Sequence, residues 1–214
     1  MGKCIAYVAA AVVFIGIGAL VAGLAVWYHH PGMTAFDTKE QRSAQCVLSK
    51  TSQGPGVEGT LYLEQLTPRT FVHITGNITG LSVGLHGFHV HEFGVDGASG
   101  KCLDAKAHYN PEGYNHSAPN ATKRHVGDLG NIESVFDSSQ DGNTLSGLSG
   151  IAYVDIKDHM ISLWGKHSIV GRAIVVHEGK DDLGLGGTEV SLKTGDAGGR
   201  LACCTIFIVP SAST

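Results

Sequence analysis

The chain has 214 residues, of which 30 are glycine and 7% are aromatic, a composition that favours many turns and short strands over long helices. Once an N-terminal segment is set aside, this length suits one domain with a single core. The net charge of −4 and the lack of a basic run argue against a nucleic-acid-binding protein, although a negative body can still carry a local positive funnel for an anionic substrate.

The N-terminal segment Ile5–Trp27 has no charged side chain and follows Lys3. A membrane span needs about 20 apolar residues, whereas the apolar region of a signal peptide needs about 7–15. The length therefore favours a hydrophobic helix at residues 1–27 that acts as a signal anchor, although the small residues Gly23 and Ala25 keep a cleaved signal peptide as the close alternative. Both alternatives predict an extracellular domain, either secreted or tethered to the membrane by this segment.

Residues 28–43 hold a His-His-Pro-Gly string and a polar stretch without periodicity, and we expect them to form a linker before a domain at residues 44–214. Three Asn-x-Ser/Thr sequons agree with an extracellular location. Asn77 and Asn120 are the better candidates for N-glycosylation, because Asn115 directly precedes a candidate metal ligand, His116.

Short β-rich runs, separated by Gly, Pro or Asn, fill most of the domain. Two long Gly-rich loops at 96–120 and 178–200 interrupt them, and loops of that length inside a compact domain are usually functional. A third connection, Ser134–Gly150, is predicted to be a solvated hairpin tip. Eight short strands with two long loops predict an all-β antiparallel sandwich or barrel. The predicted strands are Cys46–Leu48, Val57–Leu63, Phe71–Ile78, Leu85–His91, Leu129–Ser134, Ile151–Ile156, Ile169–Val176 and Leu201–Val209.

Histidines dominate the candidate chemistry. His89 and His91 lie on one predicted strand, where side chains alternate between faces, so both imidazoles point to the same side. Imidazole suits copper and zinc, and three histidines with one carboxylate form a closed tetrahedral zinc site. His108 is able to serve two sites through its two ring nitrogens. The two candidate ligand groups are His89, His91 and His177 on strands, and His116, His125 and Asp128 in or after the long loop.

From about Gln45 to the C-terminus the chain resembles the copper/zinc superoxide dismutases. Several long motifs occur in the order typical of that family, which makes the resemblance specific. It implies an eight-stranded Greek-key barrel, copper and zinc as cofactors, superoxide as substrate and a homodimer. The motifs are GFHVHEFG (Gly87–Gly94), RHVGDLGN (Arg124–Asn131), VVHE (Val175–Glu178), DDLGLGG (Asp181–Gly187) and KTGDAGGRLAC (Lys193–Cys203).

The resemblance also implies a role for each site residue. Asp181 is expected to link the free ring nitrogens of His91 and His116, since such partners fix ring orientation. His108 is expected to bridge the two metals and to carry a proton, Arg200 to lie at the mouth of the copper channel and Lys193 to lie further out in the same loop. The implied copper ligands are His89, His91, His108 and His177. The implied zinc ligands are His108, His116, His125 and Asp128.

The cysteines give a further expectation. The resemblance implies a Cys102–Cys203 disulfide, which an oxidising compartment permits. Cys204 follows Cys203 on a strand and therefore faces the other way. Cys46 and Cys204 are then expected to be small buried hydrophobic residues.

The expected activity is dismutation of superoxide to oxygen and hydrogen peroxide. One-electron chemistry needs a redox metal, so copper is the working metal, and zinc, which has no redox chemistry, is structural. One alternative is a non-catalytic copper-handling domain on the same scaffold, but all four implied copper positions are retained. A zinc hydrolase is the other alternative, but it needs an open zinc with a bound water, whereas a site of three histidines and one aspartate is closed.

Overall fold

The computed structural model of the protein describes residues 41–48, 56–96, 102–136 and 149–211. All of them belong to the second of two units, Gln41–Thr214. The predicted hydrophobic helix at residues 1–27, most of the predicted linker and the tip of the Ser134–Gly150 connection lie outside the described residues. Among the residues described, no helix is long and apolar enough to cross a membrane.

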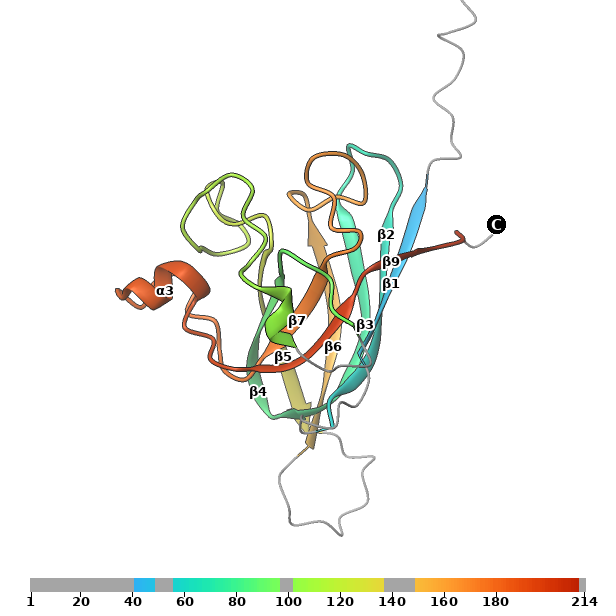
Figure 1. Cartoon of the computed structure of the whole chain (residues 1–214). Coiled ribbons are helices and arrows are strands. Elements are labelled where there is room, and N and C mark those ends of the chain that lie inside the picture. Colours follow the sequence, from blue (N-terminus) through green and yellow to red (C-terminus); the bar gives the residue numbers. More distant parts are fainter. Residues whose placement is uncertain (1–40, 49–55, 97–101, 137–148, 212–214) are drawn as a thin grey trace, which may run out of the picture. The chain divides into compact units, whose positions relative to one another are not determined.

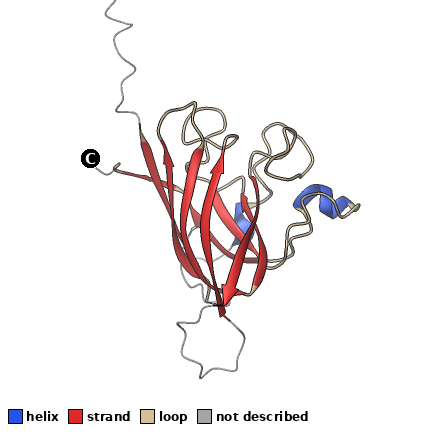
Figure 2. Ribbon diagram, turned by 180° about the vertical axis from the view of Figure 1, so that it is seen from behind, coloured by secondary structure: helices blue, strands red, loops and turns tan. Residues whose placement is uncertain are grey.

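The described part of the chain is all-β, as predicted, and its nine β segments form one antiparallel sheet (Figures 1 and 2). Each of the eight predicted strands is present. The two short helical segments, η1 (Cys102–Ala105) and α3 (Glu189–Thr194), lie in the two long loops. The strands are β1 (Arg42–Leu48), β2 (Glu58–Gln65), β3 (Val72–Ser82), β4 (Gly84–Val90), β5 (Asp128–Phe136), β6 (Ser149–Asp158), β7 (Ala173–His177), β8 (Arg200–Thr205) and β9 (Phe207–Val209).

Alternating hydrophobicity explains most of these strands. In β2, Leu61 and Leu63 are buried while Tyr62 and Glu64 are exposed, so one face packs on the core and the other meets solvent. Strand β7 is different because all five of its residues are buried. Its two faces pack against different clusters, the main core and a smaller cluster around Cys102 of η1. The long loop that carries η1 therefore covers the outer face of β7.

The strand order places the histidine-bearing strands next to each other. In the order β7-β4-β5-β6, β7 returns by a long connection to lie beside β4, which is the Greek-key arrangement. Phe88 of β4 pairs with Val176 of β7, and His89 pairs with Val175. His89, next to the last residue of β4, and His177, at the end of β7, are thereby brought together.

The C-terminal strand closes the barrel. The predicted strand Leu201–Val209 is present but divided at Ile206, so that β8 pairs with β7 at one end of the sheet and β9 pairs with β1 at the other. At the division, the backbone of Ile206 exchanges hydrogen bonds with Gly171 and Arg172 at 2.9 Å each. One continuous run of chain thus supplies both ends of the strand order (Figure 1).

A second disulfide lies beside this closure and corrects one expectation. Cys46 of β1 is bonded to Cys204 of β8, with 5.3 Å between their Cα atoms, so these two residues are not the unpaired hydrophobic residues that the sequence suggested. The expectation that they are buried is correct, as is the expectation that Cys203 and Cys204 face opposite ways, because Cys203 is bonded to Cys102. The pairing was missed because the two cysteines are 158 residues apart and meet only when the barrel closes.

Replacement of both Cys46 and Cys204 by alanine is expected to lower the free energy of unfolding by about 2–5 kcal/mol, because a disulfide that spans a long loop restricts the unfolded chain. Guanidinium denaturation of the oxidised, metal-free protein measures the change. Under strongly reducing conditions the variant and the wild type should converge, since both then lack disulfides. An unchanged midpoint under oxidising conditions would show that the bond adds no stability.

Candidate metal centre

Two buried clusters of histidine side chains lie against β4 and β7 and share one residue, His108. Within each cluster, the candidate ligand atoms all lie within 4.8 Å of one another. The structure therefore brings together every histidine that the sequence placed in the two sites. The first cluster is His89, His91, His108 and His177, and the second cluster is His108, His116, His125 and Asp128.

Backbone hydrogen bonds hold the long loop against β4, and this positions His108. Tyr109 N donates to Val90 O at 2.8 Å, and Val90 N donates to Gly127 O at 2.9 Å. The approach at Gly127 is close, because a Cβ there would lie 2.1 Å from Val90 O, so only glycine fits. His108 is thus held opposite His91, with which it forms an isolated β-bridge.

The first cluster presents imidazole nitrogens alone. His91 Nε2 lies 3.3 Å from His177 Nε2, and the rings of His89 and His108 have centroids 4.1 Å apart. Within the described residues, His89 Nδ1 and His108 Nε2 are buried with no hydrogen-bond partner. Buried polar atoms are normally paired, so these nitrogens fit a group that binds lone pairs. An all-imidazole set suits copper.

Burial keeps these rings neutral, which is the form that binds a metal. The pKa of His91 is lowered, and that of His177 is lowered to about 4. Burial is the larger cause in both, and the neighbouring His108 is the second. Burial also lowers the pKa of His89 well below its usual value. At neutral pH the lone pairs of the cluster are therefore available.

In the second cluster, three histidines surround one carboxylate oxygen. Asp128 Oδ1 lies 2.9 Å from His108 Nδ1, 2.8 Å from His116 Nδ1 and 3.0 Å from His125 Nδ1. Although they are close, His116 Nδ1 and Asp128 Oδ1 are not aligned for a hydrogen bond. Both atoms instead point toward a common centre. The other oxygen of Asp128 accepts hydrogen bonds from the backbone N–H groups of His125 and Ser117. Three nitrogens and one oxygen form the closed set that suits zinc.

Asp181 joins the two clusters, but through a different histidine than the sequence suggested. Its carboxylate accepts from His89 Nε2 at 2.9 Å and from His116 Nε2 at 2.7 Å. His91, the predicted partner, instead donates from Nδ1 to Lys106 O at 2.8 Å. The reason is ring orientation: His89 turns Nδ1 into the first cluster, whereas His91 turns Nε2 into it, so their outer nitrogens face different loops.

The carboxylates and His116 stabilise one another's charge. Burial lowers the pKa of His116, but two carboxylates outweigh it and raise that pKa to about 9: Asp128, 2.8 Å from Nδ1, and Asp181, which accepts from Nε2. Burial also raises the pKa of each aspartate, but the histidine hydrogen bonds hold both pKa values below the usual range.

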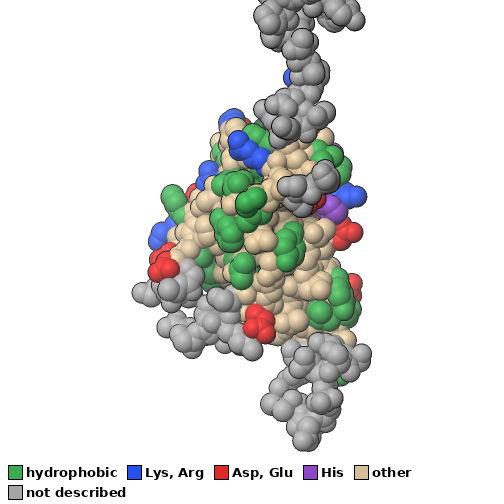
Figure 3. Space-filling model, turned by 90° about the vertical axis from the view of Figure 1, so that its right-hand side faces the viewer, with side chains coloured by type: hydrophobic (Ala, Val, Ile, Leu, Met, Phe, Trp, Pro, Cys, Tyr) green, Lys and Arg blue, Asp and Glu red, His purple; other side chains and the backbone are tan. Residues whose placement is uncertain are grey.

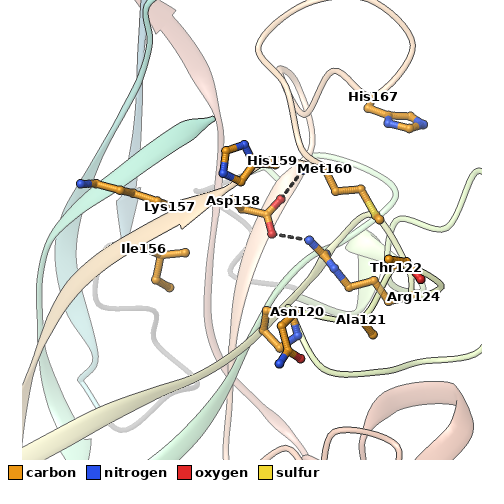
Figure 4. Close-up of a pocket in the computed structure, with 11 residues that line it drawn as sticks. Asn120, Ala121, Thr122, Arg124, Ile156, Lys157, Asp158, His159, Met160 and His167 are labelled. Atoms are coloured by element: carbon orange, nitrogen blue, oxygen red, sulfur yellow. Dashed lines mark hydrogen bonds and ion pairs between the residues drawn. The ribbon is translucent and has the colours of Figure 1, made fainter. Parts of the chain in front are cut away.

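A buried ion pair holds the turn that carries His125 and Asp128. The Arg124 guanidinium pairs with Asp158, and Asp158 Oδ1 accepts from the backbone N–H groups of Met160 and Ile161 at 2.7 and 2.9 Å. The pair lies at a hollow of about 660 Å³ between the long loop and the end of β6 (Figure 4). Arg124 belongs to the motif RHVGDLGN, but no role was predicted for it. Its Nη1 donates to three backbone carbonyls of the turn, those of His125, Val126 and Asp128.

A second residue without a predicted role is His86. It is buried, with Nδ1 2.8 Å from the carbonyl oxygen of His177 and Nε2 2.9 Å from that of Ser82. It therefore holds the backbone of a candidate ligand. Alternation along the strand places His86 on the face opposite His89 and His91, so its support of the site could not be predicted from the local pattern.

Arg200 lies at the edge of the first cluster. Its guanidinium is half-buried and donates to Cys102 O at 2.6 Å and to Lys106 O. Lys106 O also accepts from His91, so one carbonyl connects the guanidinium to the cluster. The charge of Arg200 also lowers the pKa values of His91 and His177, although burial and the neighbouring His108 have larger effects.

The segment that anchors Arg200 is itself constrained. The predicted Cys102–Cys203 disulfide is present, with 5.6 Å between the Cα atoms, and it ties η1 to β8. Lys106 has a φ of 62°, a left-handed conformation that costs a non-glycine residue roughly 1–2 kcal/mol. Lys193 lies on α3, exposed, and its Nζ is 2.5 Å from a carboxylate oxygen of Glu189.

Comparison with known proteins identifies the family. Residues 57–206 match the family model "Copper/zinc superoxide dismutase (SODC)". The chain belongs to the copper/zinc superoxide dismutase family. Superoxide dismutase (Cu-Zn) 4 of Dictyostelium discoideum is 50% identical over 151 residues, which cover 71% of this chain and 91% of the relative. Superoxide dismutase (Cu-Zn) 5 of the same organism is 47% identical over 166 residues, which cover 78% of this chain and 97% of the relative.

The family and the clusters together establish the activity. The protein is a superoxide dismutase of the copper/zinc type, with copper and zinc as its cofactors. The copper-handling alternative is not favoured, since both relatives are named superoxide dismutases.

The metal-free dismutase is expected to lose stability as the pH falls from about 6.5 toward 4. An unfolded histidine has a pKa near 6.5, whereas folded His177 has one of about 4, so the unfolded state binds more protons in this window. Each such histidine contributes up to about 1.4 kcal/mol per pH unit. His116 has the opposite sign: its stabilisation is present below pH 6.5 and is lost as the pH rises through about 9. Urea denaturation between pH 4 and 9 measures both, and a stability that stays flat below pH 6.5 would contradict the first.

Asp181→Asn is expected to weaken metal binding by roughly 10- to 100-fold, because an amide cannot accept from both His89 and His116. Competition of the variant with a chelator for zinc measures the loss. Asp182→Asn is the matched control: that carboxylate accepts from Gly184 N and Ser191 Oγ, at 2.8 Å each, instead of from the ligand rings. Equal zinc affinity in the two variants would exclude a special role for Asp181.

Proposed function

We propose that the first cluster holds copper, that the second cluster holds zinc and that His108 bridges them. The single observation that supports this most is the position of His108, whose unpaired Nε2 faces one cluster while Nδ1 lies 2.9 Å from Asp128 in the other. Bound copper supplies the one-electron chemistry that superoxide dismutation needs, and zinc supplies none. The copper ligands are His89, His91, His108 and His177, and the zinc ligands are His108, His116, His125 and Asp128.

The His108 ring is the proposed proton carrier. Burial lowers its pKa, so a proton taken up at Nε2 is held weakly and is readily given to the reduced product. The opposite nitrogen, Nδ1, faces the second cluster, where bound zinc would keep the ring in place while Nε2 gains and loses the proton. The second proton of hydrogen peroxide comes from water.

Arg200 is the proposed anion-binding residue. Two backbone carbonyls fix its guanidinium, and a guanidinium has five N–H donors, so donors remain for a small anion beside the cluster. Donors held in place before the reaction stabilise charge on the anion without reorganisation. Lys193, on the exposed α3, adds positive charge further out, although Glu189 offsets part of it.

An extracellular location is proposed on three grounds. The described residues contain two disulfides, which persist in oxidising compartments. The side chains of the three sequon asparagines are exposed: Asn77 on β3, and Asn115 and Asn120 in the long loop. The apolar segment Ile5–Trp27 precedes the domain and, if it is retained, tethers it to the membrane.

A homodimer is proposed on the basis of an apolar outer face on β1, β2 and β9. Gln45 pairs with both Tyr62 and Phe207, so these side chains point to the same face, which Val47 shares because it lies two residues along β1. Val47, Tyr62 and Phe207 are each 45–49% exposed. Figure 3 shows hydrophobic side chains gathered on the side of the domain where these strands lie. Such faces are typical of protein–protein contacts.

Arg200→Glu is expected to keep copper and zinc near one each per chain and to slow superoxide removal by roughly 10- to 100-fold at low ionic strength, because it reverses the charge and removes the donors. Arg200→Lys, which keeps the charge but loses the planar donor geometry, should be intermediate. Metal analysis and a superoxide assay on the same samples, with cyanide inhibition as a control, measure this. An unchanged rate for Arg200→Glu would refute the role of Arg200.

A further inference from the structure

Lys106 occupies an unusual position beside the first cluster. It follows η1 and precedes His108 by two residues, and its carbonyl oxygen accepts both from the Arg200 guanidinium and from His91 Nδ1. Its side chain is exposed. The backbone thus fixes the origin of a charged side chain directly beside the anion-binding residue and a candidate copper ligand.

The backbone conformation of Lys106 points to a functional role for its side chain. Among the described residues, three that are not glycine have a positive φ, and Lys106 is one of them, with a φ of 62°. Glycine adopts this conformation freely and would supply the same carbonyl. A strained residue at a functional site is a reason to ask what its side chain contributes.

We propose that the Lys106 ammonium forms part of the positive field that draws superoxide to Arg200 and the copper site. A lysine side chain reaches roughly 6 Å, and with the carbonyl and one hydrogen bond added, the ammonium stays within about 12 Å of the Arg200 guanidinium in any rotamer. The Debye length is about 30 Å at 0.01 M salt and about 8 Å at 0.15 M. The charge therefore acts on an incoming anion at low salt and is screened at high salt.

Lys106 differs in this respect from Lys193. Of the ion pairs within the described ranges, one pairs Lys193 with Glu189 and none involves Lys106. The positive charge of Lys106 is thus not offset by direct contact with a carboxylate. Since the proposal rests on the role of Arg200 proposed above, its test must separate the two residues.

The test compares Lys106→Gln, Lys106→Arg and Lys106→Gly in the metal-loaded, full-length protein. Arg69→Gln is the matched control, because it removes one exposed positive charge from the β2–β3 turn, and in the strand order β5 and β6 separate β2 and β3 from β4 and β7. At an ionic strength of about 0.01 M, the Gln and Gly variants should remove superoxide roughly two- to threefold more slowly than wild type. The difference should vanish near 0.5 M, and Lys106→Arg and Arg69→Gln should match wild type throughout.

A second readout does not depend on turnover. The dissociation constant of azide, a small monovalent anion, for the copper(II) site is measured from the visible spectrum. It should rise about twofold in Lys106→Gln at low ionic strength and stay unchanged in Lys106→Arg. Agreement between the Gln and Gly variants would assign the effect to the lost charge, because only the Gly variant also relaxes the backbone.

Two results would overturn the proposal. One is that Lys106→Gln behaves like Arg69→Gln at low ionic strength in both readouts. The other is a deficit that persists at high ionic strength, which would indicate a structural role for the residue. Arg200→Glu, measured alongside, separates the two claims. If it slows the enzyme and Lys106→Gln does not, only the Lys106 proposal fails; if neither slows it, the role of Arg200 fails as well.

Discussion

The constraint on which the site depends is that a buried imidazole with only one nitrogen facing a cluster needs a fixed partner on its other nitrogen. Such a ring presents a lone pair to a metal only if a hydrogen bond to the other nitrogen fixes its orientation. Asp181 does this for His89 and His116, and the carbonyl of Lys106 does it for His91. These partners lie in the two long loops rather than in the strands. The strands of the barrel therefore carry several of the ligand residues, and the loops determine which ring nitrogen each of these residues presents.

The loops in turn are held by bonds that cross long distances in the sequence. The Cys102–Cys203 disulfide fixes η1, and η1 supplies the carbonyl that anchors Arg200. Asp181 is fixed by Asn131 of β5, which exchanges two hydrogen bonds with its backbone at 2.8 and 2.9 Å. Arg124 fixes the turn that carries His125 and Asp128. The chemistry of the site thus depends on a frame of covalent and buried polar contacts that surrounds the ligands.

Much of this architecture could be predicted from the sequence, and the failures have a common cause. Short β-rich runs separated by Gly, Pro or Asn located the eight strands, and motifs located the residues of both clusters, because these are local patterns. Of the two predicted partners of Asp181, His116 was right and His91 was wrong, since the orientation of an imidazole is not encoded in strand alternation. The Cys46–Cys204 bond and the roles of His86 and Arg124 were missed, because each depends on segments that meet only in the folded barrel.

The division of the last strand at Ile206 has a consequence for how the protein behaves at high concentration. An open sheet ends in rows of unpaired N–H and C=O groups, which are templates on which another chain can add a strand and start an aggregate. Here β8 and β9 are the two end strands of the sheet, and they belong to one run of chain. Cys46 follows the part of β1 that pairs with β9, and its disulfide to Cys204 joins β1 to β8. Strand addition at this seam first requires the C-terminal run to detach, and a covalent bond opposes that step. The closure of the barrel thus doubles as protection against self-association through exposed strand edges.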